Sequence, residues 1–366
     1  MRILHISNHV KEIGNGIVNV AVDLACLQAK DGHNVAIASA GGEYETLLKS
    51  YGIEHFQLDQ SRTPLNIFKA AWNFWKIIQA FQPDIVHGHM MTGVVLARFL
   101  RFSDKYALVA TVHNAFQQSA VLMGLGDLVI VVSQAVGKLM SQRGIPNKKI
   151  RVVSNGTLGS PRNQNRRECS PKLLQHPTIT TVSGMYRRKG IGELIDGFAK
   201  IAEEFPEAHL YLVGNGPDRE SLEKQALETG FISRIHFEGF QPEPKSYLLA
   251  SDIFVLVSYF DSSPLVIPEA REVGCAIIGS NVDGIPEALD DGKAGILVPS
   301  KDSHTLAETL RDLLSDPQKL NFWKKQASQN IERLNAARVH RETLAVYYEL
   351  AHNYRYSKVK SGNCQA

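Results

Sequence analysis

The chain lacks several features that would assign it to particular classes of protein. Its net charge is only +3, so it has no strong basic excess of the kind typical of nucleic-acid-binding proteins. No run of about 18 apolar residues occurs that could span a membrane. The N-terminal segment Met1–Ser7 has no apolar stretch like that of a signal peptide. We therefore expect a protein without a nucleic-acid partner and without a membrane span.

Cysteine pairs and metal-ligand patterns are also missing. A disulfide framework or a zinc site needs closely spaced cysteines, but those of this chain are scattered and form no CxxC pair: Cys26, Cys169, Cys275 and Cys364. No Asp-x-Asp motif occurs, and no group of His, Cys, Asp and Glu has metal-ligand spacing. The sequence predicts reduced thiols in a cytoplasmic protein that needs neither a metal nor a cofactor.

What the chain does have is an alternation of short apolar runs with longer stretches of helical period. Hydrophobic residues make up 44% of the 366 residues, an ordinary globular composition for a chain long enough to form two domains. The alternation predicts an α/β fold with parallel sheets covered by helices on both faces. In the first half we expect helices over Val18–Lys30 and Asn66–Phe81 and strands over Ile3–Ile6, Asn34–Ala38, Asp84–His87, Ala107–Val112, Leu128–Val132 and Ile150–Val153. In the second half we expect strands over Thr178–Val182, Leu210–Val213, Ile235–Phe237, Ile253–Val257, Ala276–Gly279 and Gly295–Val298.

A polar, proline-bounded stretch at residues 158–176 interrupts the alternation and predicts a linker. We therefore expect two Rossmann-like, doubly wound domains, an N-terminal one over 1–157 and a C-terminal one over 177–337. The last helix, 338–366, is expected to pack back on the N-terminal domain. Because open parallel sheets bind ligands at the carboxyl ends of their strands, the active site is expected in a cleft between the two domains.

The segment Ile253–Gly274 is the most informative part of the chain, because a buried strand leads there through a short loop into a helix. Ser263 is a good N-cap, and Pro264 suits the first helical position. Pro268 would then remove one bond in the next turn. The helix start would present free N–H groups to an anion, on Leu265, Val266 and Ile267.

Two carboxylates flank this helix start, Asp261 before it and Glu269 eight residues later. A diphosphate bound to the N–H groups would leave one carboxylate near the ribose and the other near the sugar. The alternative is an ordinary capping acid followed by a solvated helix glutamate.

The segment resembles the E-x7-E signature of the retaining, group-1 (family 4) glycosyltransferases, which have the GT-B fold. Asp261 takes the first glutamate position and Glu269 the second. The resemblance covers nearly the whole chain. It implies that Glu269 holds the ribose hydroxyls of a nucleotide sugar and that Asp261 contacts the donor hexose.

A basic turn follows the first strand of the second domain. It contains Gly184, Arg188 and Lys189 and resembles the family's G-x(n)-R-K-G turn, in which the basic pair neutralises the diphosphate. In isolation, such a run is more often a solvated loop. Many family members carry an arginine where Met185 stands, so that donor contact is either missing here or supplied by Arg187.

The first domain contributes two further candidates. Gly16 stands at the second glycine of the family's Gly-Gly turn, where backbone could approach the donor phosphate or the acceptor. His113 ends a strand at the family's T-x-H and is implied to reach the donor sugar, although a structural histidine is the alternative. His87 and His89 match P-D-[IV]-[VI]-H, and we expect them beside the cleft. Residues 283–287 match G-G-I-P-E, with Asp283 in the first glycine position.

The resemblance implies an enzyme that moves a hexose from a nucleotide-diphosphate sugar to a hydroxyl of a glycan or lipid-linked acceptor, with retention of configuration. A UDP-sugar is the preferred donor, and guanosine and adenosine stay open as bases. The implied process is cell-surface polysaccharide or lipopolysaccharide synthesis. Arg188, Lys189 and the helix N–H groups would stabilise the leaving diphosphate in place of a metal.

Three other functions stay open. They are a non-catalytic sugar-nucleotide-binding module, a GT-B-shaped sugar-nucleotide epimerase and a nicotinamide dehydrogenase. The last is disfavoured, because the second strand ends at Ala38-Ser39-Ala40 and lacks the acid of an NAD site.

Aromatic and basic residues mix in residues 64–81 and 98–102. This composition suits a peripheral contact with the inner face of a membrane, with Trp72 and Trp75 at the headgroups. The alternative is a helix over 64–81 that is buried on two sides.

Overall fold

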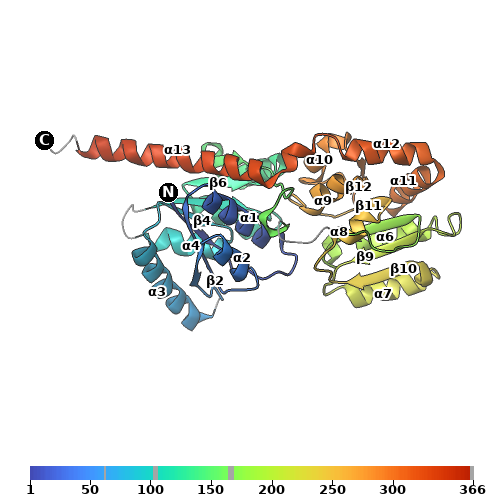
Figure 1. Cartoon of the computed structure of the whole chain (residues 1–366), viewed down its shortest axis with the longest axis horizontal. Helices are drawn as coiled ribbons and strands as arrows, with labels where there is room; N and C mark the ends of the chain where they lie inside the picture. Colours follow the sequence, from blue (N-terminus) through green and yellow to red (C-terminus); the bar gives the residue numbers. More distant parts are fainter. Residues whose placement is uncertain (62, 102–105, 164–168, 363–366) are drawn as a thin grey trace. The chain divides into compact units, whose positions relative to one another are not determined.

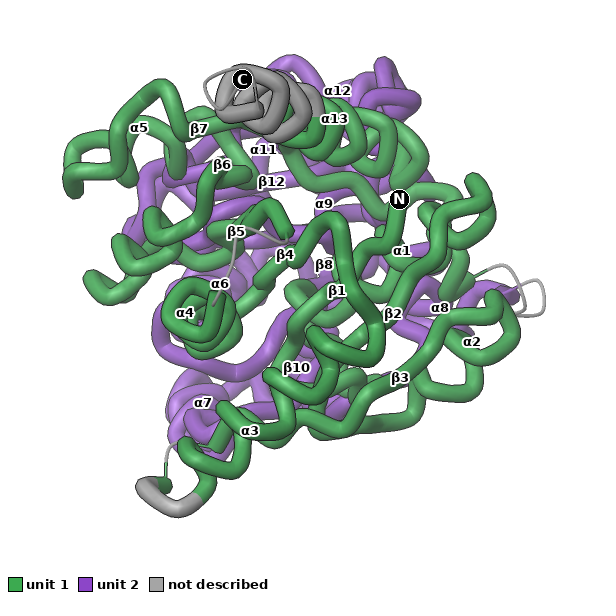
Figure 2. The backbone as a smooth tube through the Cα atoms, turned by 90° about the vertical axis from the view of Figure 1, so that its left-hand side faces the viewer, with its two compact units in different colours: residues 1–165, 335–366 green, residues 166–334 purple. Residues whose placement is uncertain are grey.

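The computed structural model describes residues 1–61, 63–101, 106–163 and 169–362. The chain folds into two compact units (Figure 2): unit 1 contains residues 1–165 and 335–366, and unit 2 contains residues 166–334. Each unit is a parallel sheet with helices on both faces (Figure 1). The predicted α/β class with two doubly wound sheets is therefore confirmed.

The described residues of unit 1 form a seven-stranded parallel sheet in the order β3-β2-β1-β4-β5-β6-β7. Its central strands are continuous apolar runs, because a parallel sheet is covered on both faces. The bounds are β1 Arg2–Ile6, β2 Asn34–Ser39, β3 Glu54–Gln57, β4 Ile85–Gly88, β5 Ala107–Val112, β6 Leu128–Val131 and β7 Ile150–Val152.

The helices of unit 1 cover the two faces of this sheet in two groups. Buried side chains of α3, α4 and α5 form one core, and those of α1 and α2 form the other. The last helix, α13, packs against α1, β5 and β6 of the same unit (Figure 1). The bounds are α1 Gly16–Lys30, α2 Glu45–Ser50, α3 Pro64–Phe81, α4 Met91–Phe99, α5 Gln134–Gln142 and α13 Ala336–Gly362.

The boundary between the units falls inside the polar segment 158–176. Hydrogen bonds hold the first part of this segment against α1 of unit 1. The guanidinium of Arg162 donates to both carboxylate oxygens of Asp23, at 2.9 and 3.0 Å. Ser160 donates to the same carboxylate at 2.5 Å. The side chains of Asp23 and Arg162 are each 6% exposed, so this ion pair is a buried element of unit 1.

The described residues of unit 2 form a six-stranded parallel sheet in the order β10-β9-β8-β11-β12-β13. The order reverses between β8 and β11, which makes their carboxyl ends the place where such sheets bind ligands. The bounds are β8 Thr178–Val182, β9 His209–Val213, β10 Ile235–Gly239, β11 Ile253–Leu256, β12 Ala276–Ser280 and β13 Ile296–Val298.

The helices of unit 2 also form two layers. Those of one core are α6, α7 and α11, and those of the other are α8, α9, α10 and α12. The bounds are α6 Ile191–Ala199, α7 Arg219–Glu228, α8 Lys245–Leu249, α9 Val266–Val273, α10 Ile285–Ala288, α11 Ser303–Ser315 and α12 Pro317–Ala327. Short 3-10 segments connect the elements: Gln118–Leu125, Asn147–Lys149, Pro161–Asn163, Arg187–Lys189, Ile232–Arg234, Asp290–Gly292 and Ile331–Leu334.

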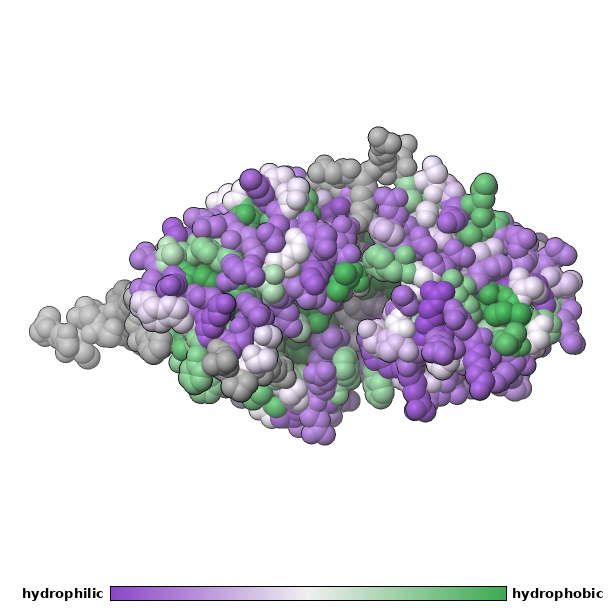
Figure 3. Space-filling view, turned by 90° about the horizontal axis from the view of Figure 1, so that it is seen from below, coloured by the Kyte–Doolittle hydropathy of each residue, from purple (hydrophilic) through white to green (hydrophobic). Residues whose placement is uncertain are grey.

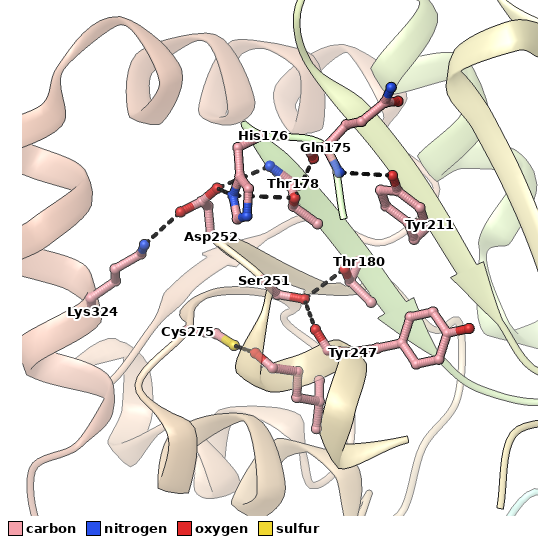
Figure 4. Close-up of polar contacts among 11 residues, drawn as sticks. Gln175, His176, Thr178, Thr180, Tyr211, Tyr247, Ser251, Asp252, Cys275 and Lys324 are labelled. Carbon is pink, nitrogen blue, oxygen red and sulfur yellow. Dashed lines mark hydrogen bonds and ion pairs between the residues drawn. The ribbon is translucent and has the colours of Figure 1, made fainter. Parts of the chain in front are cut away.

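Polar contacts fix the amino ends of β8 and β11, at the edge opposite their ligand-binding ends. The carboxylate of Asp252 accepts from the ammonium of Lys324 at 2.7 Å, from His176 at 2.8 Å and from the N–H of Thr178 at 3.0 Å (Figure 4). Although burial alone would raise the pKa of Asp252, these donors lower it below its ordinary value. The contacts hold β8, β11 and α12 together.

Among the helices in the described ranges, none combines the length and apolar character needed to cross a bilayer.

Candidate functional site

The loops that follow β8 and β11 meet at the carboxyl end of the unit 2 sheet. The N–H of Tyr259 donates to the carbonyl oxygen of Arg188 at 2.7 Å. Gly190 has a φ of +68°, and a Cβ at this residue would lie 2.0 Å from the carbonyl oxygen of Val257. The two loops therefore touch backbone to backbone, and only glycine fits position 190.

This meeting of loops brings three of the predicted site residues together. The ammonium of Lys189 lies 2.5 Å from a carboxylate oxygen of Asp261, and the two side chains are 14% and 12% exposed. Arg188 makes a long bond of 3.4 Å to the carbonyl oxygen of Phe260. Its guanidinium carbon lies 5.8 Å from the ring centroid of Tyr186. Two cations and a carboxylate thus stand side by side at the switch point of the sheet.

Asp283 is a second carboxylate in this cluster that the sequence did not identify as a site residue. It accepts the N–H of Asp261 at 2.9 Å, and its φ of +47° is one that glycine adopts without strain. Burial and the facing carboxylate of Asp261 raise the pKa of Asp283, against the opposing effect of that hydrogen bond. An aspartate at a family glycine position was the signal that could have identified it.

Tyr259 is another residue that sequence reasoning missed. Its hydroxyl bonds to Glu193 in the first turn of α6, and the ammonium of Lys301 lies 5.0 Å from its ring centroid. Burial and the neighbouring Glu193 raise the pKa of Tyr259 to about 12. The side chain therefore fastens the loop after β11 to the helix that follows the basic turn.

The helix after this loop begins later than the sequence predicted. It starts at Val266, and Leu265 occupies the N-cap position without a side-chain cap. The assignment of Ser263 as N-cap and Pro264 as first helical residue is therefore wrong. Pro268 falls in the first turn, where its missing N–H would have had no partner inside the helix, so the predicted loss of an internal bond is wrong as well.

The later start leaves the predicted backbone groups at the start of the helix unchanged. With Leu265 at the N-cap, the N–H groups that have no partner inside the helix are those of Leu265, Val266 and Ile267, because Pro268 has no N–H and that of Glu269 closes the first helical turn. Because the loop that carries Asp261 leads from the carboxyl end of β11 into α9, these groups lie at the same edge of the sheet as Lys189. The positive end of the helix dipole adds to their attraction for an anion.

The basic turn itself is shaped by backbone packing. A Cβ at Gly184 would lie 2.8 Å from the ring of Tyr186, so this glycine also permits a close approach. Met185 is completely buried in the core of unit 2. Its side chain therefore does not take the place of the family arginine on the surface of the turn.

The remaining predicted residues belong to unit 1. Gly16 is the first residue of α1, directly after the N-cap Asn15, whose side chain accepts from the N–H of Ile17. His113 follows β5, is 7% exposed, and has a pKa that burial lowers to about 3. It is therefore a neutral imidazole at physiological pH.

His113 is one end of a buried chain of histidines that crosses the sheet of unit 1. Its Nε2 lies 3.1 Å from Nδ1 of His89, and Nε2 of His89 lies 2.9 Å from Nδ1 of His5. Nε2 of His5 lies 2.7 Å from Oε1 of Gln28 in α1. His87 and His89 are buried inside the unit, and their place beside a cleft stays a prediction.

Three of these histidines form a spatial cluster that the sequence spacing could not reveal. The potential ligand atoms of His5, His87 and His89 all lie within 4.8 Å of one another. Burial lowers the pKa of each of them well below that of free histidine. Sequence spacing could not reveal this group of possible ligand atoms, because only the fold brings the three residues together.

Comparisons with known proteins agree with this architecture. The family model described as "Glycosyl transferases group 1" matches residues 163–330, and the one described as "Glycosyltransferase Family 4" matches residues 14–157. N-acetyl-alpha-D-glucosaminyl L-malate synthase of Bacillus anthracis is 24% identical over 376 residues, which cover 94% of this chain and 96% of that protein. An N,N'-diacetylbacillosaminyl-diphospho-undecaprenol alpha-1,3-N-acetylgalactosaminyltransferase of Campylobacter jejuni is 23% identical over 322 residues, 79% of this chain and 84% of that one.

Solved structures share the fold. Anabaena Alr3699/HepE in complex with UDP has a TM-score of 0.78 and 20% identity, with 95% of this chain and 100% of that chain covered. WaaG, a glycosyltransferase involved in lipopolysaccharide biosynthesis, has a TM-score of 0.73 and 15% identity, with 93% and 99% covered. These likenesses confirm the predicted GT-B fold class.

Proposed function

Because the chain belongs to the group-1, family-4 glycosyltransferases, we propose that it transfers a hexose from a UDP-sugar to a hydroxyl of a glycan or lipid-linked acceptor. Support for the donor comes from similar structures of HepE that hold UDP, UDP with glucose, or UDP-glucose. Support for a role in polysaccharide or lipopolysaccharide synthesis comes from relatives named as a lipopolysaccharide core glycosyltransferase and a putative colanic acid glycosyltransferase.

The observation that carries this proposal is the pair of cations at the switch point of unit 2, in contact with the loop that leads into α9. An ammonium has three donors, so the bond from Lys189 to Asp261 leaves two for phosphate oxygens. The low exposure of Lys189 strengthens its attraction for an anion, because less water screens the charge. Arg188 and the N–H groups of Val266 and Ile267 complete a diphosphate site that needs no metal.

The other predicted residues take roles around the diphosphate. Glu269, in the first turn of α9, holds the ribose hydroxyls, and Asp261, oriented by Lys189, contacts the hexose. Gly184 and Gly16 allow backbone to approach the donor closely. His113 contacts the hexose as a neutral group.

We propose a reaction with retained configuration and no enzyme nucleophile. The acceptor hydroxyl attacks the anomeric carbon from the face that the diphosphate leaves, and a leaving phosphate oxygen takes its proton. Arg188, Lys189 and the start of α9 stabilise the charge that develops on that oxygen, which is often the largest contribution to catalysis.

A thermal-shift panel of UDP-, GDP- and ADP-sugars tests the donor. A ligand at 100 times its Kd stabilises the folded state by about 2.7 kcal/mol, and we expect UDP-sugars to give the largest shift. Turnover is then followed as UDP release with and without a glycan or lipid-linked acceptor. Binding without transfer or hydrolysis would indicate a binding module, and an epimer formed from the donor alone would indicate an epimerase; either result overturns the proposal.

Helix α3 has an aromatic face that supports a membrane contact. Its side chains at Ala70, Phe74, Ile77, Ile78 and Phe81 are buried. On the other face Phe68 is 79% exposed and Trp72 is 56% exposed, beside Ile67 and Trp75. The alternative of a helix buried on two sides is therefore wrong.

We propose that this aromatic face binds an anionic lipid surface. Lys69 and Lys76 are exposed on the same helix, and the ammonium of Lys76 lies 5.3 Å from the ring centroid of Trp72. Phe99 in α4 is 72% exposed, whereas Phe102 lies outside the described residues. Aromatic rings with neighbouring cations suit lipid headgroups. Figure 3 shows apolar residues that reach the surface among hydrophilic ones.

Co-sedimentation with vesicles tests the lipid contact. We expect binding to vesicles that contain phosphatidylglycerol, weaker binding to purely zwitterionic ones, and loss of binding in a Phe68→Ala, Trp72→Ala double variant. Phe322→Ala, which removes a 51% exposed aromatic ring in unit 2, is the matched control. Absence of binding to both kinds of vesicle would refute the membrane contact.

A further inference from the structure

The hydrogen bonds of the buried histidines in unit 1 have a direction that follows from simple donor and acceptor rules. A neutral imidazole has one N–H donor and one lone-pair acceptor. Burial lowers the pKa of His5 to about 4 and that of His113 to about 3. It also lowers the pKa of His87 and His89. Each ring is therefore neutral at physiological pH and carries one proton, on either Nδ1 or Nε2.

The direction is set at the end of the chain inside α1. Oε1 of Gln28 can only accept, so Nε2 of His5 carries the proton and Nδ1 of His5 is an acceptor. Nε2 of His89 must then donate to His5, which leaves Nδ1 of His89 as an acceptor. Nε2 of His113 must in turn donate to His89. The one remaining ring nitrogen, Nδ1 of His113, is left without a proton.

A second branch of the network contacts the amide nitrogen of Gln28. Its Nε2 donates to the hydroxyl of Tyr347 at 3.4 Å. That hydroxyl donates to Nδ1 of His87 at 2.6 Å, and Nε2 of His87 donates to the hydroxyl of Thr111 at 2.6 Å. Gln28 and Tyr347 are completely buried. A turned amide of Gln28 would therefore require every bond of the network to reverse together.

The donors and acceptors of the ring nitrogens also argue against a metal ion at His5, His87 and His89, although their ligand atoms lie within 4.8 Å of one another. Each neutral ring offers one lone pair. The lone pairs already accept hydrogen bonds from His89, Tyr347 and His113, respectively. Metal binding would break three buried bonds at once, whereas the hydrogen-bonded network leaves each ring nitrogen of these three residues paired.

We propose that Gln28 is a positioning residue that, through His5 and His89, holds His113 in the tautomer whose Nδ1 accepts a hydrogen bond from a ligand hydroxyl. Nδ1 of His113 has no hydrogen-bond partner among the residues that the structure describes, and His113 is the most exposed of the four histidines, at 7%. A lone pair at this position attracts a hydroxyl and repels phosphate oxygens. That the hydroxyl belongs to the donor hexose, and not to another ligand, rests on the proposed function.

Histidine ¹⁵N NMR of the full-length chain tests the tautomers directly. In a long-range ¹H–¹⁵N spectrum at pH 7, protonated and unprotonated ring nitrogens resonate in separate ranges. We expect His5, His89 and His113 to be neutral, with the proton on Nε2. A proton on Nδ1 of His113 would overturn the inference, and so would stoichiometric Zn²⁺ that shifts the signals of His5, His87 and His89 together. This spectrum requires no activity, so it fails independently of the proposed function.

Two variants test the role of Gln28 separately from its contribution to packing. Gln28→Met keeps the size but removes the acceptor, and Tyr347→Phe removes the bond that holds the amide, so we expect His113 to populate both tautomers in each. His55→Gln, at a histidine that bonds to Ser39 elsewhere on the sheet, is the control and should leave the tautomer of His113 unchanged. An unchanged tautomer in Gln28→Met would overturn the inference.

Steady-state kinetics of the variants provide a second test of the role of Gln28. Loss of one hydrogen bond between neutral groups is worth about 1 kcal/mol, so we expect Gln28→Met to lower kcat/KM with UDP-glucose about fivefold. Because the effect passes through His113, a Gln28→Met, His113→Ala double variant should be no slower than His113→Ala alone. Additive losses in the double variant would contradict a positioning role.

Discussion

Lys189 and Asp261 show how individual residues connect the structure of unit 2 to the proposed chemistry. The two side chains come from loops 72 residues apart in sequence and meet at 2.5 Å. The family resemblance suggested a role for each residue separately, but their ion pair could not be derived from the sequence, because it depends on the backbone contact between the loops. The carboxylate orients the ammonium, and the ammonium is then available to a phosphate.

We predict that Lys189→Ala lowers kcat by about 10²–10³, which corresponds to roughly 3–4 kcal/mol, because it removes charge where the leaving group develops it. The fold should survive, since both side chains retain some exposure and the loops are held by backbone bonds. Initial rates with a UDP-sugar and urea denaturation measure the two effects. Lys224→Ala, at a surface pair whose side chains are 79% and 68% exposed, should change neither quantity. Full activity in Lys189→Ala would remove the site assignment.

The buried histidines predict strong acid sensitivity of unit 1. In the unfolded chain a histidine has a pKa near 6.5, whereas burial lowers it in the folded state to about 4 for His5 and about 3 for His113. Between pH 6.5 and 4 the unfolded chain therefore binds more protons, and the free energy of unfolding falls as the pH falls. With His87 and His89 included, four protons at about 1.4 kcal/mol each set an upper limit of about 5.5 kcal/mol per pH unit for this slope.

Urea denaturation at pH 7, 6 and 5 measures this slope. His304→Gln, at a side chain that is 74% exposed, is the control and should leave the slope unchanged. A free energy of unfolding that stays constant between pH 7 and 5 would contradict the assignment of neutral, buried rings.

At the scale of elements, strands were easier to predict than helix starts. Every strand predicted from the sequence is present with bounds that agree to within two residues, because strands covered on both faces are continuous apolar runs. The edge strand β3 (Glu54–Gln57) was missed, since only Phe56 among its residues is apolar. The start of α9 was placed too early, because Ser263 and Pro264 have the preferences of a helix start but stand in the loop that tertiary contacts shape.

The buried ion pair between Asp23 of α1 and Arg162, in the segment after β7, gives a prediction about stability. We expect Asp23→Ala to cost about 3–5 kcal/mol, because it leaves the guanidinium of Arg162 buried without its carboxylate. Thermal or urea denaturation measures the loss. Glu228→Ala, which breaks an exposed pair in α7, should cost about 0.5 kcal/mol or less. Equal effects of the two substitutions would show that the Asp23–Arg162 pair contributes no more than a surface pair.

At the scale of the whole molecule, composition and periodicity were sufficient to predict two doubly wound sheets. They could not predict the histidine network, because His5, His89 and His113 come from three segments that only the strand order of unit 1 brings together. Nor could they identify Asp283, whose role depends on a hydrogen bond to the loop after β11. Roles that depend on a local sequence pattern were thus predictable, whereas roles that depend on contacts between distant segments were not.

The most direct test of metal-free diphosphate binding in unit 2 is a crystal structure of the chain with UDP, from crystals grown in the presence of EDTA. We predict diphosphate oxygens within hydrogen-bond distance of Nζ of Lys189 and of the N–H groups of Val266 and Ile267, with the ribose hydroxyls on Glu269. A diphosphate bound elsewhere, or one that is ordered only when a divalent cation is added, would contradict metal-free binding at the start of α9.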